Sequence, residues 1–319
     1  MQIKSTLPLP QHNVHATARE RQGQWLLIAG GILLGTLGVF VEEAGQHPLV
    51  TVWFRCVFGG LALLAWGSTT GRLPELRLQG RAWWMAITSG ALMIVNWALF
   101  FAAIPRTSIG VATVVFHIQP IWVMLLGSWL LREKVRPRQW AATLIALCGL
   151  TLTTGLLSDT AWLHSAGNSY LMGLAMCIGG SLSYAAVTLI AKSAKSSTGT
   201  SAFALAWWQC LVGVLLLAWV PLVYGWPQQP QAWAWLAGLG VIHTGLAYVV
   251  LFAGMARLAV GKIAVLQFVY PLAAVLVDRL VYGRALSALQ IAGVLLMAAA
   301  LWAINQPKQK THPAADATH

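Results

Sequence analysis

Apolar segments of about twenty residues follow one another along almost the whole chain, and this feature constrains the fold more than any other. Residues 114–133, which read VVFHIQPIWVMLLGSWLLRE, are one such segment. A helix of about twenty apolar residues spans the hydrocarbon core of a bilayer. Only 9% of the 319 residues are charged, whereas a soluble domain has roughly a quarter. The sequence therefore predicts an all-α membrane protein.

Hydropathy and turn residues together predict ten transmembrane helices. The links between several of them are only a few residues long, which makes consecutive helices antiparallel neighbours in one bundle. We expect the polar tails, 1–24 and 305–319, to be disordered and cytoplasmic. The predicted spans are 25–45, 49–67, 82–104, 108–131, 139–157, 170–191, 202–224, 232–256, 259–282 and 286–304.

The basic residues predict which way the bundle faces. If the N-terminus is cytoplasmic, sixteen Lys and Arg residues lie on the cytoplasmic side, and only Arg106, Arg279 and Arg284 lie outside. This asymmetry follows the positive-inside rule and predicts a multi-pass protein of the inner (plasma) membrane with both termini in the cytoplasm. The formal net charge of +12 then reflects topology and attraction to anionic lipid, so no nucleic-acid partner is expected.

The fourth and fifth spans are echoed near the end of the chain. With a shift of 151 residues, FFAAIPRTSIG (100–110) aligns with LFAGMARLAVG (251–261). The same shift places Pro120 on Pro271. The matched residues that punctuate the segments, rather than the shared apolar ones, indicate an internal repeat.

Earlier spans repeat in the same way, with a shift of 154 residues. VWFRCVFGGLALL (52–64) aligns with AWWQCLVGVLLLA (206–218). Spans one to five, residues 25–157, therefore recur as spans six to ten, residues 170–304. Because five is odd, the second copy must enter the membrane from the opposite side. Inverted repeats with interrupted helices are typical of secondary transporters, whose substrate site lies near the membrane midplane.

These features resemble the drug/metabolite transporter superfamily, in its ten-helix EamA-type branch. Pro48 is followed seven positions later by Arg55. Residues 120–150, PIWVMLLGSWLLREKVRPRQWAATLIALCGL, contain the proline, the acidic residue at a helix end, and the Gln and Gly of the next helix. The resemblance implies a bundle with a central cavity that carries small metabolites, such as amino acids, often outward, by alternating access.

Two positions depart from this family pattern. The second copy, PLAAVLVDRLVYGRALSALQIAGVLL (271–296), has Arg284 where an acidic residue is usual. The first span has Leu34-Gly35 where the family commonly has Trp-Gly. The matching motifs identify the superfamily and say little about the substrate.

Pro120 and Pro271 interrupt two apolar helices at matched positions. Each removes a backbone hydrogen bond, and in a membrane the freed carbonyl must find a partner or line a cavity. We expect the two prolines to gate or shape a cavity near the midplane, although a tolerated kink is the alternative. Polar residues beside them are expected to line that cavity: His117, Gln119, Gln267 and Tyr270. For a buried His, a helix-to-helix hydrogen bond is the alternative.

Arg55 lies well inside its span, roughly 10 Å from the outer end at 1.5 Å per residue. Burying a cation costs at least a few kcal/mol unless it is paired. Arg55 therefore either has a structural partner, which is Glu42, Glu43 or a carbonyl at a helix end, or binds a substrate carboxylate. Other residues are expected around the same cavity, with an aromatic wall among them: Gln209, His243, Trp97, Phe101 and Trp207, with Tyr248 and Asn96 as further candidates.

Glu42 and Glu43 end the first span. They form either a solvated outer rim or a coupling site, in which burial raises a carboxyl pKa so that Glu43, or failing that Glu42, exchanges a proton against substrate.

The residues predict a secondary transporter for an amino acid or related carboxylate-bearing compound, working as an exporter. A proton-coupled multidrug exporter is the alternative, disfavoured because a lipophilic cation would prefer a carboxylate at mid-depth. A channel or membrane-embedded enzyme is a weaker alternative, since no catalytic cluster is visible. The chain has no phosphate-binding Gly-rich loop for ATP, and His117 and His243 lack a carboxylate between them. We expect no cofactor, no metal, and a monomer or weak dimer whose partners are substrate, lipid and, if coupled, protons.

Overall fold

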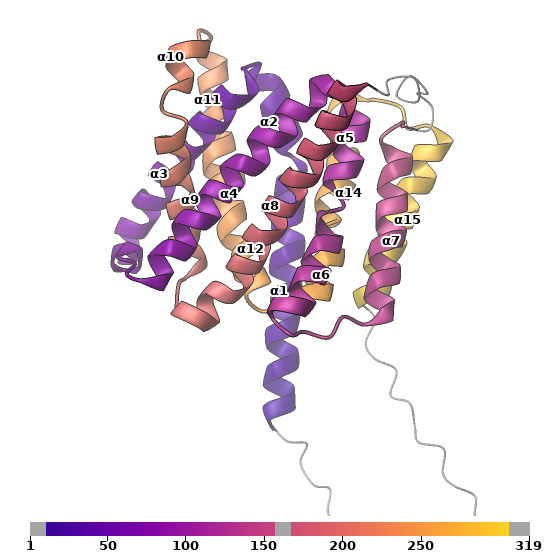
Figure 1. Cartoon of the computed structure of the whole chain (residues 1–319). Coiled ribbons are helices and arrows are strands. Elements are labelled where there is room, and N and C mark those ends of the chain that lie inside the picture. The colour runs from indigo at the N-terminus through magenta and orange to yellow at the C-terminus, as the bar shows by residue number, and fades with distance from the viewer. Residues whose placement is uncertain (1–10, 157–166, 306–319) are drawn as a thin grey trace, which may run out of the picture.

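The structure is a computed structural model that describes residues 11–156 and 167–305, and nearly all of these residues are helical. No strand occurs within these two ranges. The helices stand side by side as one bundle (Figure 1). Eight helical segments of the described residues are long and apolar enough to cross a membrane. The predicted all-α membrane fold is therefore confirmed.

Each of the ten predicted spans contains a helix. Length and hydropathy select eight of them, and the helices at the fifth and seventh predicted spans have only 17 and 15 residues. The elements of the first half are α1 (Gln11–Gly35), α2 (Leu37–Ala44), α3 (Pro48–Thr69), η1 (Leu73–Leu76), α4 (Arg81–Ala103), η2 (Ile104–Arg106), α5 (Ile109–Phe116), α6 (Gln119–Leu130) and α7 (Pro137–Thr153).

The second half also contains whole and interrupted helices. Its eighth span contains a π-helical segment, a geometry in which one turn is widened. The elements are α8 (Asn168–Thr198), α9 (Ala202–Leu216), α10 (Val220–Tyr224), α11 (Pro230–Gly238), η4 (Leu239–Leu246, the π-helical segment), α12 (Ala247–Met255), α13 (Val260–Leu266), α14 (Val269–Tyr282) and α15 (Ala288–Asn305). α13 and α14 are divided as α5 and α6 are.

The first helix begins earlier than predicted, so residues 11–24 of the predicted disordered tail are helical. This extension contacts the bundle: the Glu20 carboxylate lies 2.9 Å from Lys262 Nζ, and Gln22 accepts a hydrogen bond from Arg257. These contacts stabilise the polar segment as a continuation of the helix. The rest of the predicted tails, and most of the predicted link between the repeats, lie outside the described residues.

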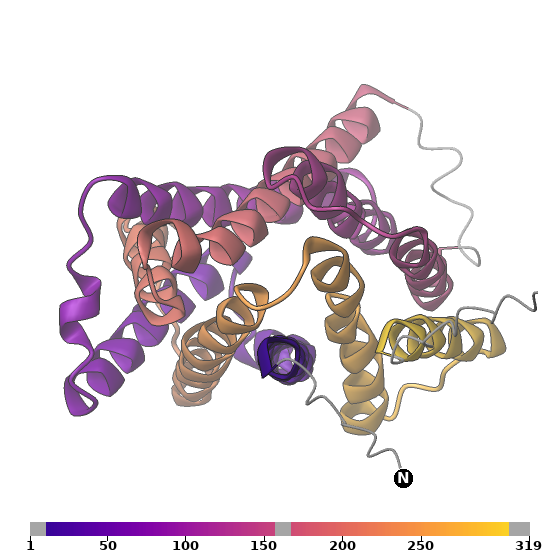
Figure 2. The same ribbon diagram turned by 90° about the horizontal axis from the view of Figure 1, so that it is seen from below.

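The helices pack in pairs along their length. α7 packs along α15, α4 along α8, and α1 against α12 and α14. Viewed along the bundle, α7 and α15 lie at one side and α3 at the other (Figure 2). Small residues permit this approach: a Cβ added to Gly293 would lie 2.4 Å from the Gly149 carbonyl oxygen. Glycine at these positions therefore allows the helices to pack closely.

The bundle has two ends that differ in what lies there. We call the end at which α1 begins and α15 ends the terminal end, at the bottom of Figure 1. The opposite end, where α2 and α14 end and α5 begins, is the mouth end. By the predicted topology the terminal end faces the cytoplasm.

Two helices are interrupted where the sequence predicts a break. α5 ends at Phe116 and α6 begins at Gln119, with Pro120 in its first turn. α13 ends at Leu266 and α14 begins at Val269, with Pro271 in its first turn. Proline is tolerated in a first turn because that turn has no use for its missing N–H. The predicted breaks at matched positions are thus present.

Candidate functional site

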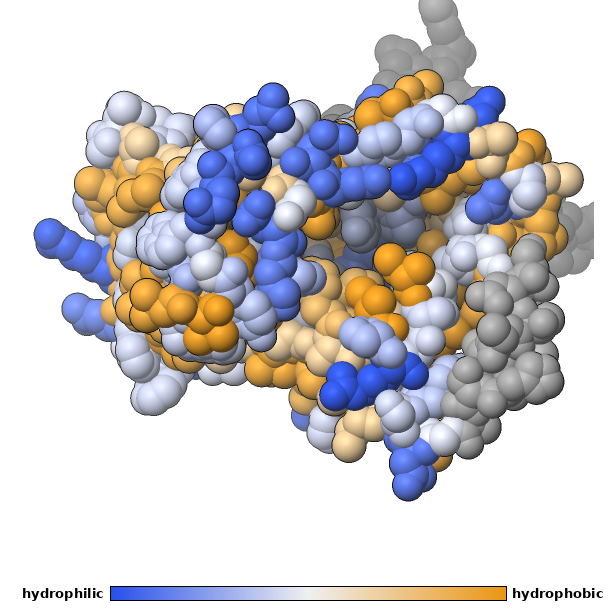
Figure 3. Space-filling model, turned by 90° about the horizontal axis from the view of Figure 1, so that it is seen from above, coloured by the Kyte–Doolittle hydropathy of each residue, from blue (hydrophilic) through white to orange (hydrophobic). Residues whose placement is uncertain are grey.

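A cavity of about 500 Å³ lies inside the bundle and opens at the mouth end. Figure 3, which looks down on that end, shows the surface hollowed between the surrounding elements. Its lining comes from α1, α2, α3, α4, α5, α8, α12 and both helix breaks. This size suits a small metabolite, since ligand pockets typically measure roughly 300–1,000 Å³.

The floor of the cavity is a hydrogen-bonded cluster that joins the two helix breaks. Gln119 Nε2 donates to Gln267 Oε1 at 3.0 Å. Both amides also donate to Thr188 Oγ1 on α8, at 3.4 Å from Gln119 and 3.2 Å from Gln267. The cluster therefore links one polar residue from each interrupted helix through a third helix, and Gln119 and Gln267 both line the cavity.

His117 and Tyr270 lie on the cavity wall just above this floor. His117 Nδ1 is 2.7 Å from the Thr113 carbonyl oxygen, so Nδ1 carries the proton and Nε2 is the free acceptor of a neutral ring. The rings of His117 and Tyr270 are stacked with centroids 6.2 Å apart. Both residues line the cavity, as the sequence predicts, and they offer one acceptor and one hydroxyl to a ligand.

Arg55 lines the cavity with only 5% of its surface exposed. Its Nε donates to Thr244 Oγ1 at 2.9 Å, and its guanidinium lies 4.4 Å from the centre of the Trp97 ring. Nη2 is buried and has no hydrogen-bond partner among the described residues. A buried donor on a cation is costly to leave unpaired, and the Arg55 side chain that carries it lies on the cavity wall.

The wall around Arg55 is mainly aromatic. Trp97 and Phe101, both predicted for this wall, line the cavity together with Phe100 and Phe116. Asn96 lies among them with 2% of its surface exposed. Its Oδ1 has no partner within the described chain. The cavity wall therefore includes two residues, Arg55 and Asn96, that each carry one buried polar atom without a partner among the described residues.

Three residues predicted for this cavity do not line it. Gln209 is buried and donates from Nε2 to Ser89 Oγ at 2.6 Å. His243 is fully buried in the π-helical segment, with Nε2 2.8 Å from Thr36 Oγ1. Trp207 packs against the hydrophobic core. Helical rotation explains these differences, because the sequence gives a residue's depth in the membrane and not the face of the helix on which it lies.

The two prolines are also placed differently. Pro120 lines the cavity, whereas Pro271 does not. Pro271 nonetheless lies in the first turn of α14, one residue after the cavity-lining Tyr270.

Glu42 and Glu43 are not buried near Arg55, which was the premise of the predicted coupling role. Glu42 Oε1 lies 2.9 Å from Arg284 Nη2, and both side chains are about half exposed. Glu43 accepts a hydrogen bond from the Tyr282 hydroxyl at 3.1 Å. The alternative pairing of Arg55 with these carboxylates is therefore wrong in this structure, because Arg284 occupies that role. Glu42 lines the cavity at its mouth.

α8 contributes residues to the wall and floor of the cavity that were not predicted from the sequence. Tyr184 lines the cavity and Thr188 completes its floor. Ser181, Tyr184, Thr188 and Lys192 are spaced three or four residues apart, which places them on one face of a helix. This polar stripe inside an apolar span was the signal that could have identified the α8 wall. Tyr248, a weaker candidate, also lines the cavity.

No group of His, Cys, Asp or Glu residues that could hold a metal ion occurs in the described parts of the chain. The Cys56, Cys148, Cys177 and Cys210 thiols are free. The cavity is thus built from hydrogen-bonding and aromatic groups, with Arg55 as its one cation among the described lining residues. Such a site can bind and release a polar organic ligand.

Comparison with known proteins agrees with this architecture. A model of the EamA-like transporter family matches the chain twice, over residues 21–155 and 171–306. A Bacillus subtilis (strain 168) protein named uncharacterized transporter YxxF is 24% identical over 278 residues, which is 86% of each chain. An uncharacterized transporter of Archaeoglobus fulgidus is 28% identical and covers 88% of this chain and 96% of its own.

A solved crystal structure shares the fold. It is 19% identical, covers 89% of this chain and 97% of its own, and superimposes with a TM-score of 0.76. At this identity the likeness concerns the fold alone, and the names of the relatives say only that they are transporters.

Proposed function

The chain belongs to the EamA-like transporter family, and from that premise we propose that it is a secondary carrier for a small metabolite with a carboxylate group. An amino acid or a related compound fits this description. We further propose that it acts as an exporter in the inner membrane, with both termini in the cytoplasm, and works by alternating access. The basic residues support this orientation through the positive-inside rule.

One observation carries the choice of substrate class, and it is the unpaired Nη2 of the buried Arg55. A charge inside a membrane protein is expensive unless it is paired or functional. No carboxylate of the described chain pairs with Arg55, since Glu42 is held by Arg284. A substrate carboxylate would supply the missing acceptor in a charge-assisted hydrogen bond.

The rest of the cavity supports a small, partly apolar substrate. Trp97, Phe101 and Tyr270 offer ring faces, whereas Asn96 Oδ1 and His117 Nε2 offer acceptors. Glu42 is the one acidic side chain among the described lining residues, and it lies at the mouth. A multidrug exporter for lipophilic cations would prefer a carboxylate inside the cavity, so the multidrug alternative has less support.

Proton exchange through Glu43 or Glu42 stays part of the proposal only as its coupling step. The half-exposed positions of these side chains favour a rim over a buried proton carrier. Substrate-driven pH change in proteoliposomes made with Glu42→Gln and Glu43→Gln tests the point. If both variants keep the pH change, the carrier is facilitative or uses another group.

The substrate class is tested by ligand-induced thermal stabilisation of the purified protein. The panel contains amino acids, other carboxylic acids and their methyl esters. For ligands that stabilise the parent, Arg55→Gln is expected to weaken affinity roughly tenfold to more than a hundredfold, because it removes a charged hydrogen bond. The esters should bind the parent as weakly as the acids bind the variant.

Two controls separate binding from folding. Arg106→Gln removes an exposed cation at the mouth end that does not line the cavity, and it should leave affinity unchanged. If Arg55 is only structural, Arg55→Gln will lower the melting temperature without ligand and leave affinity intact. Unaltered binding in Arg55→Gln, His117→Ala and Gln119→Ala alike would refute the proposed site.

A further inference from the structure

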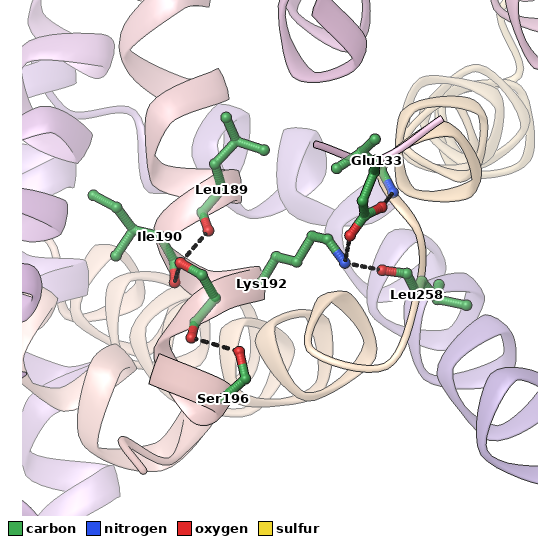
Figure 4. Close-up of polar contacts among 8 residues, drawn as sticks. Glu133, Leu189, Ile190, Lys192, Ser196 and Leu258 are labelled. Atoms are coloured by element: carbon green, nitrogen blue, oxygen red, sulfur yellow. Dashed lines mark hydrogen bonds and ion pairs between the residues drawn. The ribbon is translucent and has the colours of Figure 1, made fainter. Parts of the chain in front are cut away.

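The cavity is closed at the terminal end by a polar contact that joins three elements (Figure 4). Lys192 Nζ on α8 lies 2.7 Å from Glu133 Oε1, in the link after α6. The same Nζ donates to the Leu258 carbonyl oxygen at 2.5 Å. The other carboxylate oxygen of Glu133 accepts from the Val260 backbone N–H at 2.9 Å. One ion pair thus satisfies two backbone groups at the start of α13.

This contact is shielded from solvent. The Lys192 and Glu133 side chains are only 13% and 28% exposed. Val260 is fully buried, and Leu258 is 2% exposed. These elements belong to different halves of the chain, because Glu133 follows α6 and the other three residues lie in or after α8. The pair therefore holds the two halves together below the cavity.

The internal repeat places a second ion pair at the corresponding position of the mouth end. A shift of 151 residues moves Glu133 onto Arg284. A shift of 149 residues aligns Gly30-Gly31 with Gly179-Gly180, and it puts Glu43 on Lys192. Glu42, next to Glu43, pairs with Arg284 at 2.9 Å. Arg284 is thus the counterpart of Glu133, and its acidic partner lies one residue from the counterpart of Lys192, so acid and base have changed places.

Although the acidic and basic positions are exchanged, the pair can still make hydrogen bonds to two backbone groups. The backbone groups that correspond to Leu258 and Val260 are the Thr107 carbonyl and the Ile109 N–H, at the start of α5. An arginine can donate to a carbonyl and a carboxylate can accept from an N–H. Glu42 and Arg284 can therefore satisfy the same two groups with the roles of the partners exchanged.

In the present structure the mouth pair does not meet that segment. Ile109 is 68% exposed, whereas its counterpart Val260 is fully buried. Glu42 and Ile109 both line the open cavity. We infer that Glu133 and Lys192 form the closing contact of the terminal end, and that Glu42 and Arg284 form the closing contact of the mouth by docking on residues 107–109. This inference rests on the alternating access of the proposed function.

The test measures which end of the cavity is open, in the full-length protein in membrane vesicles. A cysteine at Tyr184, which lines the cavity eight residues from Lys192 on α8, is labelled with a membrane-impermeant maleimide from either face. The background carries Cys148→Ser, because Cys148 is exposed. Ser197→Cys and Gln229→Cys, both exposed and at opposite ends of the bundle, identify the two faces.

Glu133→Gln is expected to raise labelling from the terminal face relative to the mouth face by about tenfold, the effect of losing one charge-assisted contact. The amide keeps an oxygen for Val260, so the variant isolates the ion pair. Lys192→Met removes the cation of the same pair, and it replaces Glu133→Gln in the test if that variant fails to fold. Arg284→Gln should shift the ratio in the opposite direction and offset Glu133→Gln when the two are combined.

Glu75→Gln is the matched control, because its ion pair with Arg72 lies at the terminal end within one short link. A ratio for Glu133→Gln and Lys192→Met that equals the ratio for Glu75→Gln would overturn the terminal closing contact. A shift by Arg284→Gln in the same direction as Glu133→Gln would overturn the mouth contact. Labelling uses no substrate, so either result is separate from the outcome of the Arg55 binding test.

Discussion

The two ends of the cavity, which the predicted repeat aligns, differ in how tightly they are closed. At the terminal end, Val260 is fully buried and its N–H is bonded to Glu133. At the mouth end, the corresponding Ile109 is 68% exposed. The terminal ion pair is largely shielded, whereas the mouth pair is half exposed. The segment around Val260 is thus closed, whereas the segment around Ile109, which the predicted repeat aligns with it, is open.

Under the proposed alternating access, this difference lets one repeated unit form the gates at both ends. If both ends were closed, the cavity would have no entrance, and if both were open, the protein would be a pore. Interfaces that have two discrete packed arrangements switch between them rather than deforming continuously. We therefore expect substitutions at the terminal end to change both the stability of the fold and which end of the cavity is open. The same substitutions at the mouth should have weak effects.

The largest effect is expected where α6 packs on α13 at the terminal end. A Cβ on Gly127 would lie 2.5 Å from Val260 Cγ1, and a β-branched neighbour cannot easily turn away. Gly127→Val should therefore lower stability by about 3 kcal/mol, the upper end of the usual range for overpacking, because the added Cβ alone already meets Val260. The measurement is the melting temperature of the purified protein in detergent.

The matched change at the mouth is Gly38→Val. Gly38 lines the cavity in α2, and an added Cβ there meets nothing within 4 Å. Its melting temperature should equal or exceed that of the parent, because valine is a better helix former than glycine. If the two variants lose the same stability, the ends are packed alike and the comparison fails.

Much of the fold could be predicted from the sequence. Apolar length fixed the membrane class, and the prolines fixed where α6 and α14 begin, because both signals act locally along the chain. The helical start at Gln11 could not be predicted in this way. It depends on Glu20 reaching Lys262, a contact between residues that are distant in sequence.

The candidate site was predicted in part. Arg55, His117 and Gln119 could be predicted because each is a polar residue inside an apolar span, where such residues are often functional. All three line the cavity. Gln209 and His243 interrupt spans in the same way, yet they bond to neighbouring helices. Depth in the membrane can be read from a sequence, whereas rotation about the helix axis is set by packing between helices.

The next effect in size compares the two ion pairs directly. Lys192→Met leaves Glu133 without its cation and the Leu258 carbonyl without its donor. Because these groups are mostly shielded, the loss should be about 1.5–3 kcal/mol. Arg284→Met removes the half-exposed pair at the mouth, and solvent screens such pairs, so its melting temperature should stay close to that of the parent.

The dependence on salt concentration also distinguishes the terminal ion pair from the mouth ion pair. Raising the ionic strength weakens exposed charge pairs more than shielded ones. The melting-temperature difference between parent and Lys192→Met should therefore persist in high salt, whereas any difference for Arg284→Met should disappear. Equal sensitivity of the two differences to salt would mean that the terminal pair is as open to water as the mouth pair.

The smallest effect is expected for the Arg72–Glu75 pair, which lies at the terminal end and joins two residues of one short link. The pair is close, with Arg72 Nε 2.7 Å from Glu75 Oε1, and it lies in the short link that contains η1. The hydrogen bond from Arg72 is the main cause that lowers the pKa of Glu75 below its ordinary value. A substitution in the Arg72–Glu75 pair therefore reports the effect of removing a charge at the terminal end, separately from the effect of opening that end.

A carboxyl group whose pKa is lowered by folding stabilises the folded state only while it is ionised. Its contribution is fully present above the unfolded pKa of about 4.3 and is lost as the pH falls through the lower folded pKa. The small melting-temperature advantage of the parent over Glu75→Gln should thus hold at neutral pH and vanish in acid, while both proteins give the same labelling ratio for the two faces. A pH-independent difference would mean that hydrogen bonding without charge holds this link. A changed labelling ratio would mean that closure of the terminal end extends to α3 and α4, which flank the link, and does not depend on Glu133 and Lys192 alone.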